Sequence, residues 1–185
     1  MTDTGDSVTR RTNCHNTNNC DANNPDWSPD GSRIVWTYAG QPGIIVVRNL
    51  EGGTEQQLTY GQFSSWSPDG AWIAYMYQDD IYVISASGGS TYRLTTNPGR
   101  DMLPDWSPNG SWIAFTSNRS GNNDIWVMDS RGESFGLWQI TDHSGDDQAP
   151  SWSPDGKKIV FQSDRSGNRD IWIASNLGIP EIIFI

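Results

Sequence analysis

Two Asp–Arg combinations are the residues in this sequence best suited to ionic chemistry. Asp101 is followed by Arg119 and Asp147 by Arg165, so the same two residue types recur at the same separation. A guanidinium group presents a planar fork that can bind a carboxylate through two parallel hydrogen bonds. The sequence therefore predicts that each Asp pairs with its Arg and that each pair ties two loops together. The alternative is a role in ligand binding, and we nominate all four as candidate binding residues.

Further acidic and imidazole groups lie in segment 142–147, just before the second Arg. His143, Asp146 and Asp147 are candidate binding residues there, and the two carboxylates are the hard oxygen ligands that calcium prefers. The segment lacks the ordered ligand spacing of a calcium loop, so neither a metal site nor a cofactor is predicted. His15 is the only other histidine, and neither histidine lies in a motif that would orient a Ser-His-Asp set. The sequence predicts a binding protein rather than an enzyme.

Cys14 and Cys20 are the only cysteines and lie in an Asn-rich stretch near the N-terminus. Three interpretations are open: a local disulfide, as in an exported protein, two free thiols, or a zinc site that also uses His15. Two cysteines and one neighbouring histidine supply neither a fourth ligand nor the paired spacing of strong zinc motifs. The cellular compartment therefore stays open.

A fourfold repeat identifies the elements that must position these residues. Aligning the chain with itself superimposes four copies of Trp-Ser-Pro-Asp/Asn-Gly, whose tryptophans are Trp27, Trp66, Trp106 and Trp152. They are separated by 39, 40 and 46 residues, which is the period of a four-stranded propeller blade. Ser-Pro-Asp/Asn-Gly has the residues of a tight turn between strands, so its acidic residue is predicted to be structural. The four tryptophans are predicted to be core residues that pack between blades.

A β-rich run after each turn is predicted to be the second strand of the unit, and the apolar run after it is predicted to be the third. A fourth strand is suggested in the first three units. No segment keeps the apolar period of a helix. The predicted fold class is all-β: a β-propeller of four four-stranded antiparallel blades. We predict a single propeller domain, with an N-terminal outer strand and loop at 1–24 and blades at 25–60, 61–95, 96–141 and 142–185.

The charge of the chain excludes some classes of partner. It has 12 basic and 22 acidic residues and a net charge of −10, so its surface repels phosphate backbones and anionic lipids. No apolar run reaches about 18 residues, and residues 1–24 are polar, so neither membrane insertion nor a signal peptide is predicted. We expect no nucleic acid and no membrane among the partners.

The motif Pro-Asp-Trp-Ser-Pro-Asp-Gly is followed by Ile-Ala-Phe and then by Ser-Asn-Arg-Ser-Gly-Asn-Asn-Asp-Ile-Trp. Over residues 25–176 this pattern resembles the blades of TolB-type β-propellers, a WD-like repeat family. It also resembles the propeller domain of prolyl-oligopeptidase-like enzymes. The resemblance implies that the blades recognise partners or gate access rather than perform chemistry. It also implies a periplasmic or extracellular location.

Closure of the ring needs an explanation, because blades of this type resemble those that close in rings of six or more. Ser7–Thr12 and Ile179–Ile185 both have the character of an outer end strand. Three possibilities are open: the four blades close by themselves, two chains complete a shared structure by exchanging end strands, or the sequence is a piece of a longer one. We predict a homo-oligomer formed through the end strands.

The function predicted from these features is non-catalytic recognition of a protein or peptide. The binding surface is predicted to be the acidic loop face formed by residues 117–124, 142–147 and 163–170. The alternative is a propeller that binds a small ligand or calcium in its central channel. A third interpretation is a hydrolase-type or lyase-type propeller, or a fragment of a larger propeller protein.

Overall fold

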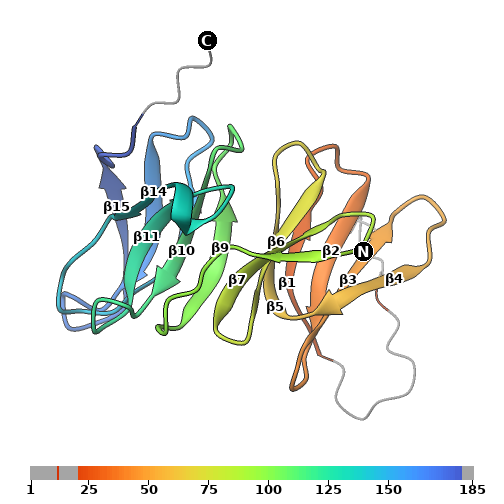
Figure 1. Ribbon diagram of the computed structural model, residues 1–185, viewed down its shortest axis with the longest axis horizontal. Coiled ribbons are helices and arrows are strands. Elements are labelled where there is room, and N and C mark those ends of the chain that lie inside the picture. The colour runs from red at the N-terminus through yellow and green to blue at the C-terminus, as the bar shows by residue number, and fades with distance from the viewer. Residues whose placement is uncertain (1–11, 13–20, 181–185) are drawn as a thin grey trace, which may run out of the picture.

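The computed structural model describes Thr12 and residues 21–180, which form four antiparallel sheets in chain order (Figure 1). Blade 1 consists of β1 (Ala22–Trp27), β2 (Arg33–Tyr38), β3 (Ile44–Asn49) and β4 (Glu55–Tyr60). Blade 2 consists of β5 (Gln62–Trp66), β6 (Trp72–Tyr77), β7 (Asp80–Ser85) and β8 (Thr91–Arg93). Blade 3 consists of β9 (Asp101–Trp106), β10 (Trp112–Ser117), β11 (Asp124–Asp129) and β12 (Leu137–Gln139), with the short 3-10 helix η1 (Glu133–Phe135) before β12. Blade 4 consists of β13 (Asp147–Trp152), β14 (Lys158–Ser163) and β15 (Asp170–Ser175).

The predicted all-β class and the four blades are confirmed. Three blades have four strands each, and blade 4 has three among the described residues. Its predicted fourth strand lies mostly in residues 181–185, outside the described part. β1 begins at Ala22, inside the segment 1–24 that we assigned to the N-terminal strand and loop. Within the described residues η1 is the only helix, as the missing helical period predicts.

Side-chain hydrogen bonds fix the turn after the inner strand of each blade. In blade 1, Ser28 Oγ donates to Asp30 at 2.6 Å and accepts from the backbone nitrogen of Arg33 at 2.8 Å. Gly31 takes the left-handed conformation, with a φ of 68°. Hydrogen bonds from the side chains of Ser28 and Ser32 lower the pKa of Asp30 to about 2. The predicted structural role of these turn residues is confirmed, because the same Ser bond recurs at Asp69, Asn109 and Asp155.

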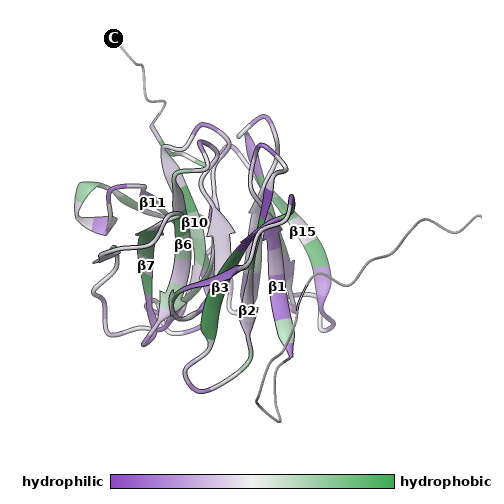
Figure 2. Cartoon of the chain, turned by 90° about the vertical axis from the view of Figure 1, so that its right-hand side faces the viewer, coloured by the Kyte–Doolittle hydropathy of each residue, from purple (hydrophilic) through white to green (hydrophobic). Residues whose placement is uncertain are grey.

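Three hydrophobic cores lie between neighbouring blades. In each, the second and third strands of one blade face the inner and second strands of the next. The third-strand residues Ile45, Ile81 and Ile125 occupy equivalent positions, and all three are 0% exposed. Figure 2 shows hydrophobic stretches along β3, β7 and β15, whereas β1 is largely hydrophilic. Each blade therefore depends on its neighbour for burial of its third strand.

Blade 4 has an apolar face that no described residue covers. Ile171 and Ile173 on β15 are 68% and 66% exposed. Their equivalents in blade 3, Ile125 and Val127, are both 0% exposed because blade 4 packs on them. The outward face of blade 4 therefore has the residues of a blade–blade interface without a partner blade.

The prediction that all four motif tryptophans are core residues is wrong for Trp27. Trp66 and Trp152 are 5% and 8% exposed and Trp106 is half-buried, whereas Trp27 is 61% exposed. Trp66 and Trp152 pack against the third strand of the preceding blade, and blade 1 has no preceding blade among the described residues. The outward faces of blades 1 and 4 are thus both open, and the blades form a row rather than a ring closed by packing (Figure 1).

The inner strands β1, β5, β9 and β13 lie next to one another along the inner edge of the row, and the open space that they line is called the central channel here. Neighbouring inner strands are in contact, and all four line a hollow of about 230 Å³. Each strand has a register shift, where one non-glycine residue takes a φ between 51° and 56°. These residues are Asn24, Phe63, Leu103 and Ala149. The bulges give the four inner strands the same kink around the channel.

Several predicted features lie outside the described residues. They are Cys14, Cys20, nearly all of Ser7–Thr12, and the apolar residues 181–185. The disulfide, the zinc alternative and the strand exchange therefore stay predictions. Within the described part of the chain, no helix has the length and apolar character that crossing a membrane requires.

Candidate functional site at the loop end

Both predicted Asp–Arg pairs form, and they lie at one end of the blades. This loop end carries the loops between the second and third strands and the connections from one blade to the next. Asp101 and Asp147 begin the inner strands β9 and β13, and Arg119 and Arg165 lie in the loops that follow β10 and β14. The Nη2–Oδ2 distances are 2.8 Å for Asp101–Arg119 and 2.5 Å for Asp147–Arg165. Each pair ties two loop-end segments of one blade together.

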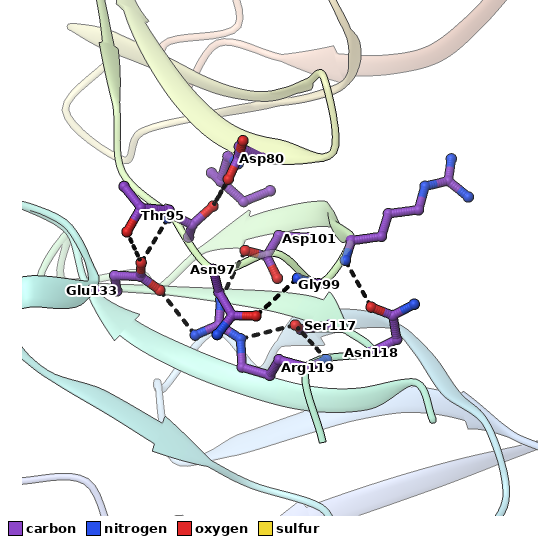
Figure 3. Close-up of polar contacts among 12 residues, drawn as sticks. Asp80, Thr95, Asn97, Gly99, Asp101, Ser117, Asn118, Arg119 and Glu133 are labelled. Atoms are coloured by element: carbon purple, nitrogen blue, oxygen red, sulfur yellow. Dashed lines mark hydrogen bonds and ion pairs between the residues drawn. The ribbon is translucent and has the colours of Figure 1, made fainter. Parts of the chain in front are cut away.

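The side chain of Arg119 is only 5% exposed. Figure 3 shows it among Asp101, Ser117 and Glu133. Its guanidinium carbon lies 5.2 Å from the ring centres of both Phe115 and Trp126. Its Nε donates to Ser117 Oγ at 2.9 Å. Burial raises the pKa of Asp101, while the Ser117 hydrogen bond and the charge of Arg119 act to lower it. The cation therefore compensates a carboxylate that is buried in the protein.

Glu133 extends this network from blade 3 to blade 2. Its Oε2 accepts from Arg119 Nη1 at 2.9 Å, and its Oε1 accepts from the backbone nitrogen and hydroxyl of Thr96 at 2.6 and 2.8 Å. Burial opposes ionisation of Glu133, but the hydrogen bonds from Thr96 and Arg119 outweigh it and hold its pKa below the ordinary value. Arg119 is thus engaged by two carboxylates, which supports the structural interpretation of this pair.

Arg165 has a similar setting with more access to solvent. Its guanidinium carbon lies 4.9 Å from the Trp172 ring centre and 5.3 Å from that of Phe161. Its Nε donates to Ser163 Oγ at 3.0 Å, and its side chain is 20% exposed. Asp147 itself is 0% exposed. A ligand could reach part of this guanidinium but not the carboxylate beneath it.

Asp146 and His143 hold the connection that enters blade 4. Asp146 Oδ1 accepts from the backbone nitrogen of Asn123 at 3.1 Å, and its own backbone nitrogen donates to Asp164 at 2.8 Å. His143 is exposed, and its Nδ1 accepts from the backbone nitrogen of Gly145 at 2.9 Å. Of the six nominated residues, His143 is thus the one that presents its side chain most openly to solvent.

A hollow of about 380 Å³ opens at the loop end between blades 1 and 2. In blade 2, Gly61 occupies the place that the Asp of the ion pair has in blades 3 and 4, and Asp79 occupies the place of the Arg. Both residues line the hollow. Met76 and Tyr77 contribute apolar surface, and Arg100 pairs with Asp79 at 3.1 Å on the rim. The hollow was not predicted, although the sequence shows the departure from the repeat: Gly61 lies five residues before Trp66 and Asp79 thirteen after it, where the later blades have Asp and Arg. The space opens where the chain lacks the ion pair that closes the later blades.

A second feature that sequence analysis missed is a pair of carboxylates in the central channel. Asp26 and Asp105 come from the same position of blades 1 and 3, and both line the channel hollow. Asp105 accepts from the backbone nitrogen of Trp152 at 2.7 Å, and Asp26 accepts from that of Trp66 at 2.8 Å. Burial, with a further contribution from the negative charge of Asp26, raises the pKa of Asp105 to about 6. Each carboxylate therefore joins two blades and carries an electrostatic penalty when charged.

The described residues bring no three His, Cys, Asp or Glu side chains together as a metal site would require. The two carboxylates considered for calcium at the loop end are engaged within the protein, Asp147 by Arg165 and Asp146 by Asn123. The loop end thus offers fixed loops, an exposed ion pair and a hollow. Together with the fold, this defines the chain as a β-propeller scaffold whose loops are held by buried ion pairs.

Comparison with known proteins identifies the family. A family model described as the TolB beta propeller domain matches residues 23–137. The Tol-Pal system protein TolB of Bordetella pertussis is 34% identical over 115 residues, which are 55% of this chain and 26% of that protein. The crystal structure of TolB from Acinetobacter baumannii superimposes with a TM-score of 0.74 at 26% identity, covering 84% of this chain and 41% of that one. A prolyl endopeptidase superimposes with a TM-score of 0.62 at 16% identity, covering 85% of this chain and 28% of the other, which shows the fold alone.

The chain belongs to the TolB-type β-propeller family, as the resemblance of its blades predicts. It spans about a quarter of the Bordetella protein and 41% of the Acinetobacter chain. The match to the family model covers blades 1 and 2 and most of blade 3.

Proposed function

We propose that this chain is a non-catalytic propeller that recognises a protein or peptide at its loop end. The observation that carries the proposal is the hollow between blades 1 and 2, which opens where the Asp–Arg pair is replaced by Gly61 and Asp79. The loops around it are held by backbone hydrogen bonds such as that from Gly61 to the carbonyl oxygen of Gly43 at 2.9 Å. A rigid rim around an unfilled space lets a partner side chain bind with little loss of loop entropy.

The chemistry of the rim favours a polypeptide partner. Met76 and Tyr77 supply apolar contact area, and the amides of Gln62 and Gln78 can hydrogen-bond to a peptide backbone. The Asp79–Arg100 pair has side chains that are 64% and 48% exposed, so both charges are available to a ligand. His143, the exposed residue of the blade 4 connection, and the partly exposed Arg165 belong to the same loop end and extend the proposed surface.

The relatives support the same proposal. The Bordetella protein is named as a component of the Tol-Pal system. We propose that this chain likewise acts by binding another protein of such a system and that it is exported from the cytoplasm. No catalytic role is assigned, because the resemblance to peptidases is one of fold.

The test is recovery of a partner from an extract of a bacterium that has a Tol-Pal system, using Arg100→Glu as the variant. Arg100 lies on the rim, and the matched control is Lys157→Glu, an exposed cation at the opposite end of blade 4. We expect one defined protein to bind the unchanged chain and Lys157→Glu but to be lost with Arg100→Glu. Equal recovery by all three proteins would contradict the proposed site.

We also propose that the chain forms a homo-oligomer. The predicted end strands lie mostly outside the described residues, but the open faces of blades 1 and 4 support association. Trp27 occupies the position that meets the third strand of a preceding blade, and Ile171 and Ile173 belong to such a third strand. A head-to-tail contact between two copies would join complementary halves of a blade–blade interface.

A second candidate function is binding of a cation or small ligand in the central channel. The carboxylates Asp26 and Asp105 favour it, because a cation between them would offset their mutual repulsion. The test is the melting temperature with and without millimolar calcium. A calcium-dependent rise that Asp105→Asn abolishes would support this function, and the absence of any rise would exclude it.

A further inference from the structure

A third, mainly apolar hollow lies at the end of the blades opposite the loop end, between blades 2 and 3. This turn end carries the Ser-Pro-Asp/Asn-Gly turns and the segments that follow the third strands. The hollow has a volume of about 510 Å³, within the range of sites that bind ligands. Its apolar lining consists of Trp72, Val83, Tyr92, Leu94 and Trp106. None of these residues belongs to the proposed loop-end site.

The repeat supplies an internal comparison for this hollow. On β8, Tyr92 is paired with Val83, and on β12, Trp138 is paired with Val127 at the equivalent position. By the same register, Trp72 at the start of β6 corresponds to Trp112 at the start of β10. The aromatic pair Trp72–Tyr92 between blades 2 and 3 therefore corresponds to the pair Trp112–Trp138 between blades 3 and 4.

The two aromatic pairs differ in how well they are covered. Trp112 is 6% exposed, its ring centre lies 4.9 Å from that of Trp138, and both residues belong to the core between blades 3 and 4. The ring centres of Trp72 and Tyr92 are 6.0 Å apart, and Tyr92 is 56% exposed. The second aromatic residue of the pair is thus exposed between blades 2 and 3, where Tyr92 lines the hollow, and partly buried between blades 3 and 4. A hollow of about 500 Å³ also lies between blades 3 and 4, but Leu177 and Ile179 line it together with Trp112.

Two side chains account for the difference. Leu177 and Ile179, in the irregular segment after β15, pack against the core between blades 3 and 4. In blade 3, Arg131 and Glu133 lie as far beyond the end of the third strand, β11, as Leu177 and Ile179 lie beyond the end of β15 in blade 4. Both are directed to other partners: Arg131 pairs with Asp129 and lies 4.6 Å from the Phe135 ring centre, and Glu133 binds Arg119. The apolar floor between blades 2 and 3 is consequently left without the cover that its counterpart has.

We propose that the hollow between blades 2 and 3 docks a short apolar segment of a partner protein. The segment would have two aliphatic side chains separated by one residue, which would take the places that Leu177 and Ile179 take in the next interface. Trp72, Trp106 and Tyr92 are the aromatic anchors, the residue types that dominate binding energy at such sites. Asp69 and Arg131 also line the hollow, but its large side chains are apolar, so a segment with aliphatic side chains fits it better than a charged one.

The probe for this site is a synthetic peptide with the sequence of residues 174–180, Ala-Ser-Asn-Leu-Gly-Ile-Pro, titrated into the full chain to millimolar concentration. Binding is followed by NMR, through the indole signal of Trp72 and the backbone signals of Tyr92 and Leu94. We expect saturable shifts at these three residues and none at the loop-end residues Gln78 and Arg100. A second peptide, with both aliphatic residues replaced by Asp, should produce no such shifts.

Tyr92→Ala tests the anchor, and the matched control is Tyr60→Ala, because Tyr60 is 50% exposed and lies outside the hollow. Both tyrosines are exposed, so neither variant should prevent folding, and a thermal melt verifies this. We expect Tyr92→Ala to weaken the peptide by about fivefold or more and Tyr60→Ala to leave its affinity unchanged. The proposal is overturned if the peptide does not bind, if its Asp version binds equally well, or if Tyr92→Ala binds as tightly as the unchanged chain. Because the loop end is not involved, Arg100→Glu should bind this peptide normally even if it loses the loop-end partner.

Discussion

Asp105 and Asp26 line the same hollow, the central channel, and the negative charge of Asp26 adds to the effect of burial on the pKa of Asp105. The two residues are 79 positions apart in the chain and come from the inner strands of blades 1 and 3. Each accepts a hydrogen bond from the backbone of the next blade, Asp26 from Trp66 and Asp105 from Trp152. The channel thus brings together two acids that hold blades together while repelling each other.

The first prediction concerns Asp105→Asn and the pH dependence of stability. The pKa of Asp105 is raised from 3.8 to about 6 in the folded protein, so the folded state binds this proton more tightly than the unfolded state. Its contribution to stability is therefore present below pH 4 and is lost as pH rises through about 6, a change of about 1–3 kcal/mol. Asn keeps an acceptor for the Trp152 backbone but carries no charge. We expect the variant to be more stable than the unchanged chain above pH 6, with the advantage shrinking toward pH 4.

Urea unfolding followed by tryptophan fluorescence from pH 4 to pH 8 measures this difference. Asp69→Asn is the control, because hydrogen bonds from Ser67 and from the Ala71 backbone lower the pKa of Asp69. Blade 3 already has Asn109 at that turn position, bonded in the same way, so the control should fold normally. The change in unfolding free energy caused by Asp69→Asn should be nearly constant from pH 4 to pH 8. A flat difference for Asp105→Asn as well would contradict the raised pKa.

The repeated elements could be predicted from the sequence, and the sites could be predicted only in part. Local patterns determine the turns and strands, and the two Asp–Arg pairs could be predicted because both residue types recur at the same separation. The channel acids were overlooked because Asp26 and Asp105 were treated as ordinary motif residues, and only the arrangement of blades makes them line the same hollow. Trp27 was assigned to the core because a Trp recurs at the same motif position in all four blades, but its burial depends on a neighbouring blade and not on local sequence.

The second prediction is that Arg119 contributes to stability rather than directly to binding. Arg119→Ala leaves Asp101 and Glu133 without their cation in a setting where the Arg side chain is 5% exposed. Breaking a buried ion pair in this way costs about 3–5 kcal/mol. Urea unfolding should show a loss of this size. Arg100→Ala is the control, because its pair with Asp79 is exposed and should contribute less than about 1 kcal/mol. A small loss for Arg119→Ala would point instead to a role in ligand binding.

The third prediction concerns Thr95 and Thr141, which follow the outer strands β8 and β12 of blades 2 and 3. Thr95 Oγ1 accepts from the backbone nitrogen of Ile81 at 3.0 Å and donates to Asp80 at 3.3 Å, and Thr141 makes the same two bonds in blade 3. Thr95→Val keeps the shape but removes the hydroxyl from a site that is 0% exposed. We expect a loss of about 1–3 kcal/mol in unfolding free energy. The exposed Thr54→Val should change it by less than about 0.5 kcal/mol, and an equally small effect for Thr95→Val would show that the hydroxyl is dispensable.

The fourth prediction tests whether the open face of blade 4 mediates association. Ile171 and Ile173 are 68% and 66% exposed at positions where their equivalents in the three other blades are at most 7% exposed. If a second copy covers this face, replacing both residues by Asp places two charges in the interface and should abolish association. Light scattering at several concentrations should then give the monomer mass for the variant and a larger, concentration-dependent mass for the unchanged chain. Phe135→Asp is the control, since Phe135 is 62% exposed but lies on η1, away from both end faces. A monomer mass for the unchanged chain at every concentration would refute self-association and leave the loop end and the hollow between blades 2 and 3 as the binding surfaces to test.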